Sequence, residues 1–292
     1  MTVERDLRGT NFVFFGGSTG LGHATALEIG RRGADVLIVG RGRAAGEAAA
    51  TEIKAAGAAS ADFLAGDLST VAGATEAAAG VKRWRPELHG VMHTALSVSR
   101  TRKTTADGLE SHFAIGYLAR AVINRLLVDE LAASGDGRIL HGSGSVRGIA
   151  SKLFMPDLDD LQFERRTWGF FKSMLPNHQL NYFHVQEAAR RWADRPVTLT
   201  LFCVGPTKTK VMGDKNMHPV NRLAVRFGMP PERSARNAVR VLTAASAQDV
   251  NGTVLRNATS FSPEKLAMDT THTAKLWDIT GTIAAEHGTE LP

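Results

Sequence analysis

Short apolar runs alternate with longer segments of helical spacing along nearly the whole chain. Seven runs lack polar alternation, which is typical of strands buried on both faces of a sheet, and they lie at residues 11–15, 35–39, 62–64, 90–93, 138–141, 197–203 and 253–255. Segments rich in Ala, Leu, Arg and Glu lie between them, for example at 20–32, 44–56 and 107–133. A strand-helix-strand repeat of about 30 residues implies right-handed crossovers. The pattern therefore predicts an α/β fold, a doubly wound parallel sheet of about seven strands with helices on both faces.

The longest stretch without a regular pattern covers residues 205–231 and contains four prolines and three methionines. It follows the sixth predicted strand, at the carboxyl edge of the sheet, where ligands bind in open α/β folds. Met212, Met217 and Met229 supply flexible apolar side chains that suit an irregular hydrophobic ligand. Since no linker or internal repeat divides the chain, we expect a single domain over residues 1–292, with residues 205–231 as a substrate lid within it.

A glycine-rich turn joins the first predicted strand to the first predicted helix, where three glycines form the pattern G-x-x-x-G-x-G. In such a turn one glycine permits the tight bend, another lets the backbone approach a pyrophosphate, and a third lets helix and strand pack closely. Its place between a strand and a helix favours this interpretation over a plain surface turn. The cofactor contacts expected here are Gly16, Ser18, Thr19, Gly20, Leu21 and Gly22.

The end of the second predicted strand indicates which nicotinamide cofactor would bind. Where an acidic residue would bind a ribose 2′-hydroxyl, the chain has Gly40 and Arg41. A guanidinium pairs with a 2′-phosphate and a carboxylate would repel it, so Arg41 favours NADP(H) over NAD(H); the alternative is a solvated surface arginine. After the third strand, Asp67 and Leu68 fit an acceptor for the adenine edge and an apolar wall, although Asp67 is also a good helix N-cap.

Composition and charge narrow the class of protein. Hydrophobic residues make up 43% of the 292 residues, which is enough for a large core. The chain has 35 Lys and Arg against 29 Asp and Glu, which gives a net charge of +6 and a pI of about 9.7. Because the basic residues are scattered, we expect no nucleic-acid partner. The apolar runs are shorter than a membrane span of ~20 residues, and residues 2–6 show no apolar signal segment, so we expect no membrane span and a cytoplasmic protein. Cys203 is the single cysteine, and no ligand-spaced His or carboxylate cluster occurs, so we expect no metal site.

These features together resemble the short-chain dehydrogenase/reductase family, from Asn11 to about Ile283. The resemblance is closest to its retinol-dehydrogenase-like branch. Residues 155–161, Met-Pro-Asp-Leu-Asp-Asp-Leu, are similar to that branch's acidic segment before the catalytic helix, and residues 276–278, Leu-Trp-Asp, are similar to its Leu-Trp-Glu. The resemblance implies a Rossmann-type doubly wound sheet of seven strands, a nicotinamide cofactor, and an Asn-Ser-Tyr-Lys set that moves a proton to or from the substrate oxygen. It also implies a homo-oligomer, a dimer or a tetramer, between which the sequence does not decide.

The Asn and Ser of that catalytic set are altered in this chain. Gly116 stands in the place of the family's Asn. The family's two serines after the fifth strand correspond to Ser143 and Gly144, and the second of these is the usual catalytic position. Ser143 or Ser145 could substitute for the missing hydroxyl.

The helix that carries Tyr-x-x-x-Lys in the family admits three registers here. The favoured register matches residues 178–191 to the family's Lys-Leu-Ala-Asn through Arg-Arg pattern, and it places His178 at the lysine and Met174 at the tyrosine. A register through Tyr182 leaves only about 20 residues before the turn after the sixth strand, where the family usually has nearly 30. A third register, with Trp168 in the tyrosine place, fits less well.

Further cofactor contacts implied by the resemblance follow the fourth and sixth predicted strands. The family's Asn-Asn-Ala-Gly stretch is altered to His-Thr-Ala-Leu at residues 93–96, where Thr94 and Ala95 would line the cofactor. The family's Pro-Gly turn is reversed, and Pro206 is followed by Thr207 and Thr209, which could touch the nicotinamide amide and the diphosphate.

A methionine at the tyrosine position changes the chemistry, because it donates neither a proton nor a strong hydrogen bond, and a positioned general acid contributes ~10²–10⁴ to a rate. Three alternatives stay open. The proton donor could be relocated to His178, Tyr182, a serine near Ser143, or water. Of these, histidine titrates near neutral pH, and His178 could also bind the ribose. An iminium ion or a conjugated acceptor would need no strong acid. A third alternative involves no redox chemistry and relies on proximity alone.

Histidines near the strand ends add to the site that the sequence predicts. His93 and His141 end the fourth and fifth predicted strands, and as a pair they are the expected unusual contribution to the site, with packing at the strand ends as the alternative. Tyr117 follows the lost Asn position and is a further candidate donor.

We therefore expect an atypical NADPH-dependent reductase of a hydrophobic small molecule, such as an imine, a conjugated acceptor or a ketone, that lacks the usual catalytic Tyr and Lys. The alternative is a non-redox enzyme, a cyclase or isomerase, or a catalytically silent cofactor-binding protein on the same fold.

Overall fold

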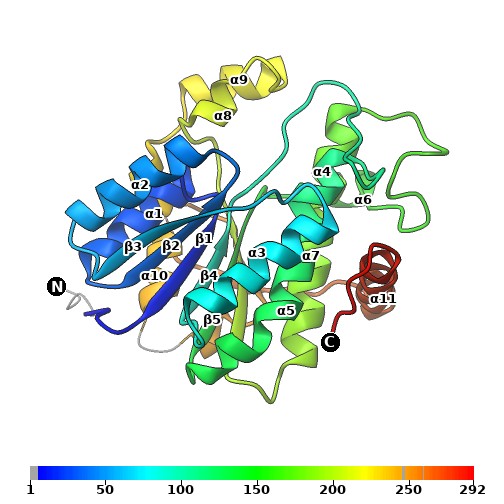
Figure 1. The fold of residues 1–292 in the computed structure, drawn as a ribbon. Coiled ribbons are helices and arrows are strands. Elements are labelled where there is room, and N and C mark those ends of the chain that lie inside the picture. The colour runs from blue at the N-terminus through cyan, green and yellow to red at the C-terminus, as the bar shows by residue number, and fades with distance from the viewer. Residues whose placement is uncertain (1–5, 245–246, 259) are drawn as a thin grey trace.

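One eight-stranded sheet runs through the molecule, in the order β3-β2-β1-β4-β5-β6-β7-β8 (Figure 1). The computed structural model describes residues 6–244, 247–258 and 260–292; residues 2–5, part of the segment used to judge a secretory signal, lie outside them. The strands are β1 (Asn11–Phe15), β2 (Asp35–Gly40), β3 (Ser60–Ala65), β4 (Gly90–His93), β5 (Gly137–Ser143), β6 (Val197–Cys203), β7 (Thr253–Leu255) and β8 (Pro263–Lys265). The first seven are parallel, and β8 pairs antiparallel with β7.

Helices cover both faces of this sheet (Figure 1). Their bounds are α1 (Gly20–Arg31), α2 (Arg43–Ala55), α3 (Val71–Trp84), α4 (Ser111–Phe113), the π-helix η1 (Ala114–Leu118), α5 (Ala119–Ala133), α6 (Ile149–Leu153), α7 (Phe170–Arg191), α8 (Lys210–Gly213), α9 (Pro219–Arg226), α10 (Pro231–Thr243), the 3₁₀-helix η2 (Gln248–Val250) and α11 (Thr270–Glu286). α1, α2 and α10 lie on one side, and α3, α5 and α7 lie on the other, with α11 packed against α7. The predicted α/β fold with helices on both faces is confirmed.

The continuous apolar run of β1 shows why such strands are buried on both faces. Because successive side chains point to opposite faces of a strand, Val13 and Phe15 enter the core beneath α3, α5 and α7, whereas Phe12 and Phe14 enter the core beneath α1 and α10. All four side chains are at most 2% exposed. Strands of this kind need a helical layer on each side, which the alternating pattern along the chain supplies.

Three expectations about elements need correction. The sheet has eight strands rather than seven, because β8 is three exposed residues with no apolar run to indicate it. The helix expected over 107–133 begins at Ser111 and passes through η1, whose wider turns centre on Gly116. The segment 205–231 is less irregular than expected, since it contains the helices α8 and α9, and Met217 within it is buried.

The strand order places the reversal point of the sheet between β1 and β4. From β1 the chain proceeds outward through β2 to β3 and then returns to form β4 on the other side of β1. In open α/β sheets the crevice at such a reversal, outside the carboxyl ends of the strands, is where ligands bind. This end also carries the turn after β1, and α8 and α9 extend above it (Figure 1).

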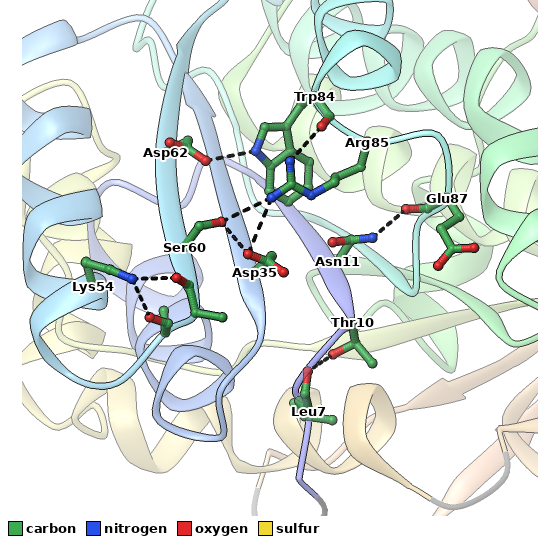
Figure 2. Close-up of polar contacts among 12 residues, drawn as sticks. Leu7, Thr10, Asn11, Asp35, Lys54, Ser60, Asp62, Trp84, Arg85 and Glu87 are labelled. Carbon is green, nitrogen blue, oxygen red and sulfur yellow. Dashed lines mark hydrogen bonds and ion pairs between the residues drawn. The ribbon is translucent and has the colours of Figure 1, made fainter.

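The opposite end of the sheet is fastened by polar contacts that are structural (Figure 2). The Ser60 hydroxyl donates to Asp35 Oδ1 at 2.5 Å, and Arg85 Nη2 lies 3.5 Å from the same carboxylate. The Trp84 indole donates to Asp62 Oδ2 at 2.9 Å. These bonds tie the end of α3 to the start of β2 and to β3, so the carboxylates at this end are committed to holding the fold.

A cluster of buried imidazoles fills the core between the sheet and the helices α5 and α7. His93 Nε2 lies 2.8 Å from Asn124 Oδ1, and Asn124 Nδ2 lies 2.8 Å from His141 Nε2 and 3.1 Å from His184 Nε2. The three histidines are at most 3% exposed. Burial is the main cause that lowers their pKa, to about 3 for His93 and His184 and well below the usual value for His141. All three are therefore neutral at physiological pH.

This cluster predicts a specific acid sensitivity of the fold. A histidine with a lowered folded-state pKa binds a proton in the unfolded chain first, so its contribution is intact above about pH 6.5 and is lost as the pH falls toward the folded value. Each histidine lowers the free energy of unfolding by about 1.4 kcal/mol for each pH unit in that window, so the three together lower it by roughly 4 kcal/mol per pH unit. Urea unfolding between pH 7.5 and 5 should show this slope, and His184→Phe should reduce it by about one proton. A flat profile over this range would contradict the neutral cluster.

Candidate functional site

The glycine-rich turn after β1 packs against the residues that follow β4. Gly16 has a φ of +97°, and a Cβ there would lie 2.5 Å from the Ala95 nitrogen. A Cβ on Gly22 would lie 2.5 Å from Thr94 Oγ1, which donates to the Gly16 carbonyl at 3.1 Å. The turn thus requires glycines for close backbone approach, and it leads into the N-terminus of α1. Four of the predicted cofactor contacts are brought together here.

The segment after β6 reaches the other side of the same turn. Gly20 has a φ of +63°, and a Cβ there would lie 3.0 Å from the methyl carbon of Thr209. The Thr209 hydroxyl caps α8 by accepting from the Met212 N–H at 3.3 Å. The buried Thr207 hydroxyl lies 2.8 Å from Ser234 Oγ, and the Pro206 carbonyl accepts from the Met229 N–H. Thr209 therefore adjoins the turn, whereas the Thr207 hydroxyl is already engaged by α10.

The residues expected to read the adenosine half lie at the ends of β2 and β3. Arg41 directly follows β2 and is exposed. The Gly66 N–H donates to the Gly40 carbonyl at 3.0 Å, which keeps the two strand ends adjacent. Asp67 closes a local turn by accepting from the Ser69 N–H, while Thr70 caps α3, so the N-cap alternative for Asp67 is wrong. Leu68 is buried in the core and has little surface to offer a ligand.

His178, on α7, is fixed by the loop that follows β5. The Gly144 N–H donates to His178 Nδ1 at 3.1 Å, and Ser143 Oγ lies 3.1 Å from the same nitrogen. Because a backbone N–H can only donate, Nδ1 is the unprotonated nitrogen and the proton of the neutral ring sits on Nε2. Burial, followed by the positive charge of Arg120, lowers the pKa of His178 to about 4. His178 is therefore a neutral imidazole with an Nε2–H donor.

The same imidazole takes the space of a side chain that residue 144 lacks. A Cβ on Gly144 would lie 2.5 Å from His178 Nε2 and 2.6 Å from Cδ2. A serine at this position would collide with the ring. The hydrogen-bond donor at the end of β5 is thus the Nε2–H of His178 on α7, in place of the hydroxyl of a serine at position 144. Met174 lies one helical turn before His178, and Pro176 lies between them.

A parallel replacement occurs at Gly116, in the π-helix η1. A Cβ there would lie 2.2 Å from Asn177 Nδ2, which donates to the His112 carbonyl at 2.8 Å. The Gly116 carbonyl accepts from Asn181 Nδ2 at 2.9 Å. The side-chain amide that an asparagine at position 116 would place here is therefore supplied by Asn177 from α7. No sequence pattern indicates this exchange, because Asn177 and Asn181 have the ordinary spacing of helix neighbours.

Two predictions about proton donors are corrected by the contacts. The Tyr182 hydroxyl donates to the Gly144 carbonyl at 2.8 Å and accepts from the Val146 N–H at 3.3 Å. Burial raises the pKa of Tyr182, so this hydroxyl keeps its proton, and it uses that proton to hold the loop after β5. The Tyr117 hydroxyl is likewise buried, 2.7 Å from Thr280 Oγ1. His93 and His141 also belong to the core cluster, which matches the packing alternative, and they do not face the crevice.

Sequence reasoning missed Arg120, a buried arginine on α5. It is 5% exposed, and its guanidinium donates to the carbonyls of Gly142 and Ala95 at 2.7 and 2.9 Å. The only available signal was a basic residue inside the apolar stretch 113–123. Within the described residues, no group of three His, Cys, Asp or Glu is placed to hold a metal ion.

Fold and turn together define a doubly wound α/β protein with a glycine-rich turn at the reversal point between β1 and β4. Comparison with known proteins extends this to a family. The profile described as short chain dehydrogenase matches residues 11–153. Human retinol dehydrogenase 13 is 26% identical over 92% of this chain and 82% of its own length, and bovine retinol dehydrogenase 12 is 30% identical over 72% and 65%. A solved 3-oxoacyl (acyl-carrier-protein) reductase from Agrobacterium tumefaciens C58 with NADP bound has the same fold, with a TM-score of 0.65, 18% identity, and coverage of 85% of this chain and 93% of that one.

The chain belongs to the short-chain dehydrogenase/reductase family, and it is similar to the retinol dehydrogenases within it. This is a family of oxidoreductases that bind a nicotinamide cofactor. The resemblance seen in the sequence is thereby confirmed.

The contact between Gly144 and His178 yields a test by double substitution. Gly144→Ala should lower the free energy of unfolding by about 1–3 kcal/mol, because the new methyl must displace the imidazole. The same change in a His178→Ala background should cost much less, since the ring is gone. Gly213→Ala, where a Cβ meets no atom within 4 Å, is the matched control. Equal costs in both backgrounds, measured by urea unfolding, would show that the ring does not occupy this space.

Proposed function

We propose that this protein is an NADPH-dependent reductase of a hydrophobic small molecule that works without the tyrosine and lysine of its family. The observation that carries the proposal is the neutral imidazole of His178, held by the loop after β5 with its Nε2–H over Gly144. It offers a hydrogen-bond donor where the family's serine would place one.

The residues around the turn after β1 suit a dinucleotide phosphate. Gly16 and Gly22 let the turn pack closely against Ala95 and Thr94 as it enters the N-terminus of α1, where N–H groups and the helix dipole favour an anion. Arg41, exposed directly after β2, would pair with a 2′-phosphate. The NADP bound by the Agrobacterium reductase of the same fold is consistent with this choice. NADPH, when bound, supplies a hydride.

The protonation state of His178 limits the substrates that it can serve. With a pKa lowered to about 4, the ring at neutral pH polarises a carbonyl or imine through Nε2–H but gives no proton as an imidazolium. Met174 has no hydroxyl to do so, and the Tyr182 hydroxyl bonds to the Gly144 carbonyl. We therefore infer that protonation comes from solvent, which favours imines, iminium ions and conjugated acceptors over simple ketones.

The segment 205–231 supports a hydrophobic substrate. Met212 and Met229 are partly exposed in it, and Phe227, 87% exposed, adds an aromatic ring. Relatives named as retinol dehydrogenases point to apolar substrates as well. We propose that this segment is the substrate lid of a single domain. No helix among the described residues is long and apolar enough to span a bilayer.

Three further inferences accompany this function. Residues Ser18, Thr19 and Leu21 complete the phosphate contacts, and the protein forms a homodimer or homotetramer in the cytoplasm, as is common in its family.

A non-redox reaction is the second candidate function. Met174 at the place of the family's tyrosine favours it, because alkoxide chemistry there has no acid.

Cofactor binding is the first test of this proposal. A fluorescence titration should give micromolar binding of NADPH and much weaker binding of NADH, because Arg41 pairs with the 2′-phosphate. Arg41→Glu should weaken NADPH binding by tenfold or more, an order-of-magnitude expectation for one charge-assisted pair, and leave NADH nearly unchanged. Arg83→Glu, the same charge change near the opposite end of the sheet, should affect neither. No binding of either nucleotide would overturn the reductase proposal.

A second experiment separates the two candidate functions. Met174→Tyr restores a hydroxyl one turn before His178, so consumption of NADPH with a ketone should rise if the protein is a reductase limited by its proton donor. His178→Ala in that background should reverse the gain, since it removes the second donor. A protein that binds NADPH but consumes none with imines, enones or ketones, before and after this change, would support the non-redox alternative.

A further inference from the structure

The guanidinium of Arg120 joins the ends of β4 and β5, beside the reversal point of the sheet. Nη2 donates to the Ala95 carbonyl after β4, and Nη1 donates to the Gly142 carbonyl in β5 and lies 3.4 Å from Asn181 Oδ1. Ala95 packs directly against Gly16, and Gly142 lies two residues before Gly144. The guanidinium thus contacts the carboxyl ends of β4 and β5, and its positive charge acts on His178.

This cation has no carboxylate partner within the described chain. Its contacts are carbonyl and amide oxygens, and its Nε is buried without a hydrogen bond. Two buried acids, Glu110 and Glu187, are engaged elsewhere, since Glu110 accepts from Ser173 and Trp168, and Glu187 pairs with arginines of its own helix. The imidazoles beside Arg120 are neutral.

An unpaired buried charge is costly, which argues against a purely structural role. Burial alone lowers the pKa of Arg120 to about 10, so the group stays charged at neutral pH. A neutral amide could bridge two carbonyls without the cost of desolvating a cation. The charge itself therefore needs a reason, and the site supplies one, because the family's lysine position holds the neutral His178.

We propose that Arg120 supplies the positive charge of this site in place of the missing lysine, and that its uncompensated charge makes the site bind NADPH more tightly than NADP⁺. The inference rests on the proposed function. The oxidised nicotinamide ring is a cation and the reduced ring is neutral, so a nearby guanidinium with no counter-ion disfavours only the oxidised form. The same field stabilises negative charge that develops on a substrate oxygen or carbon.

The test compares the affinities of the two redox forms in three proteins. The wild type should bind NADPH about tenfold more tightly than NADP⁺, Arg120→Lys should keep most of this ratio, and Arg120→Met should bring it close to one. Calorimetric titration measures both dissociation constants without turnover. If Arg120 is only a structural bridge, Arg120→Met will weaken both forms equally and the ratio will survive, which overturns the proposal. Failure of every protein to bind either form would instead refute the proposed function.

Relocating the charge controls for misfolding of Arg120→Met. His178→Lys alone places a second cation beside Arg120 and should lower the melting temperature. Combined with Arg120→Met, the lysine replaces the lost charge, so the double variant should recover both melting temperature and the preference for NADPH. If the effects of the two substitutions on melting temperature and on the preference for NADPH are simply additive, the two positions do not share one charge. That result would contradict the inference.

Discussion

The hydrogen bond from the Gly144 N–H to His178 Nδ1 is the contact on which the chemistry of this site depends. It fixes the tautomer, because the ring nitrogen that accepts from a backbone amide cannot also carry a proton. The absence of a side chain at Gly144 leaves room for the ring, and the Tyr182 hydroxyl holds the carbonyl of the same residue. This geometry places a neutral donor over Gly144. Burial and the charge of Arg120 keep the ring from becoming an imidazolium at neutral pH, so the proposed reaction leaves protonation to solvent.

Beneath that contact lies a polar core that is unusual for a sheet of this kind. Asn124 links three neutral imidazoles, and Asn181 links His141 and Arg120 to the π-helix η1. A buried hydrogen-bond network of this sort favours one arrangement of strands and helices, because each displaced group would lose partners in a low-dielectric interior. The site therefore has a rigid floor on β4, β5 and α7, whereas the segment 205–231 above it is built of short helices with exposed apolar side chains.

Much of the fold could be predicted from the sequence, because buried parallel strands and a glycine-rich turn leave strong local patterns. The exposed strand β8 left none. At the site, Thr94 and Thr209 could be placed from the resemblance, and His178 from the register of α7. The protonation state of His178, the commitment of Tyr182 to the loop, and the filling of the Gly116 space by Asn177 could not be predicted. Each depends on contacts between residues 34 to 61 positions apart, which no local pattern records.

The central claim is that a neutral imidazole, protonated on Nε2, stands at the position of the family's serine. Nitrogen-15 NMR of the histidine side chains, with His178→Gln used to assign the signal, tests it directly. At pH 7 the account predicts a His178 ring with a protonated Nε2 and an unprotonated Nδ1, unchanged down to about pH 5. A charged ring at pH 7, or a proton on Nδ1, would contradict the account.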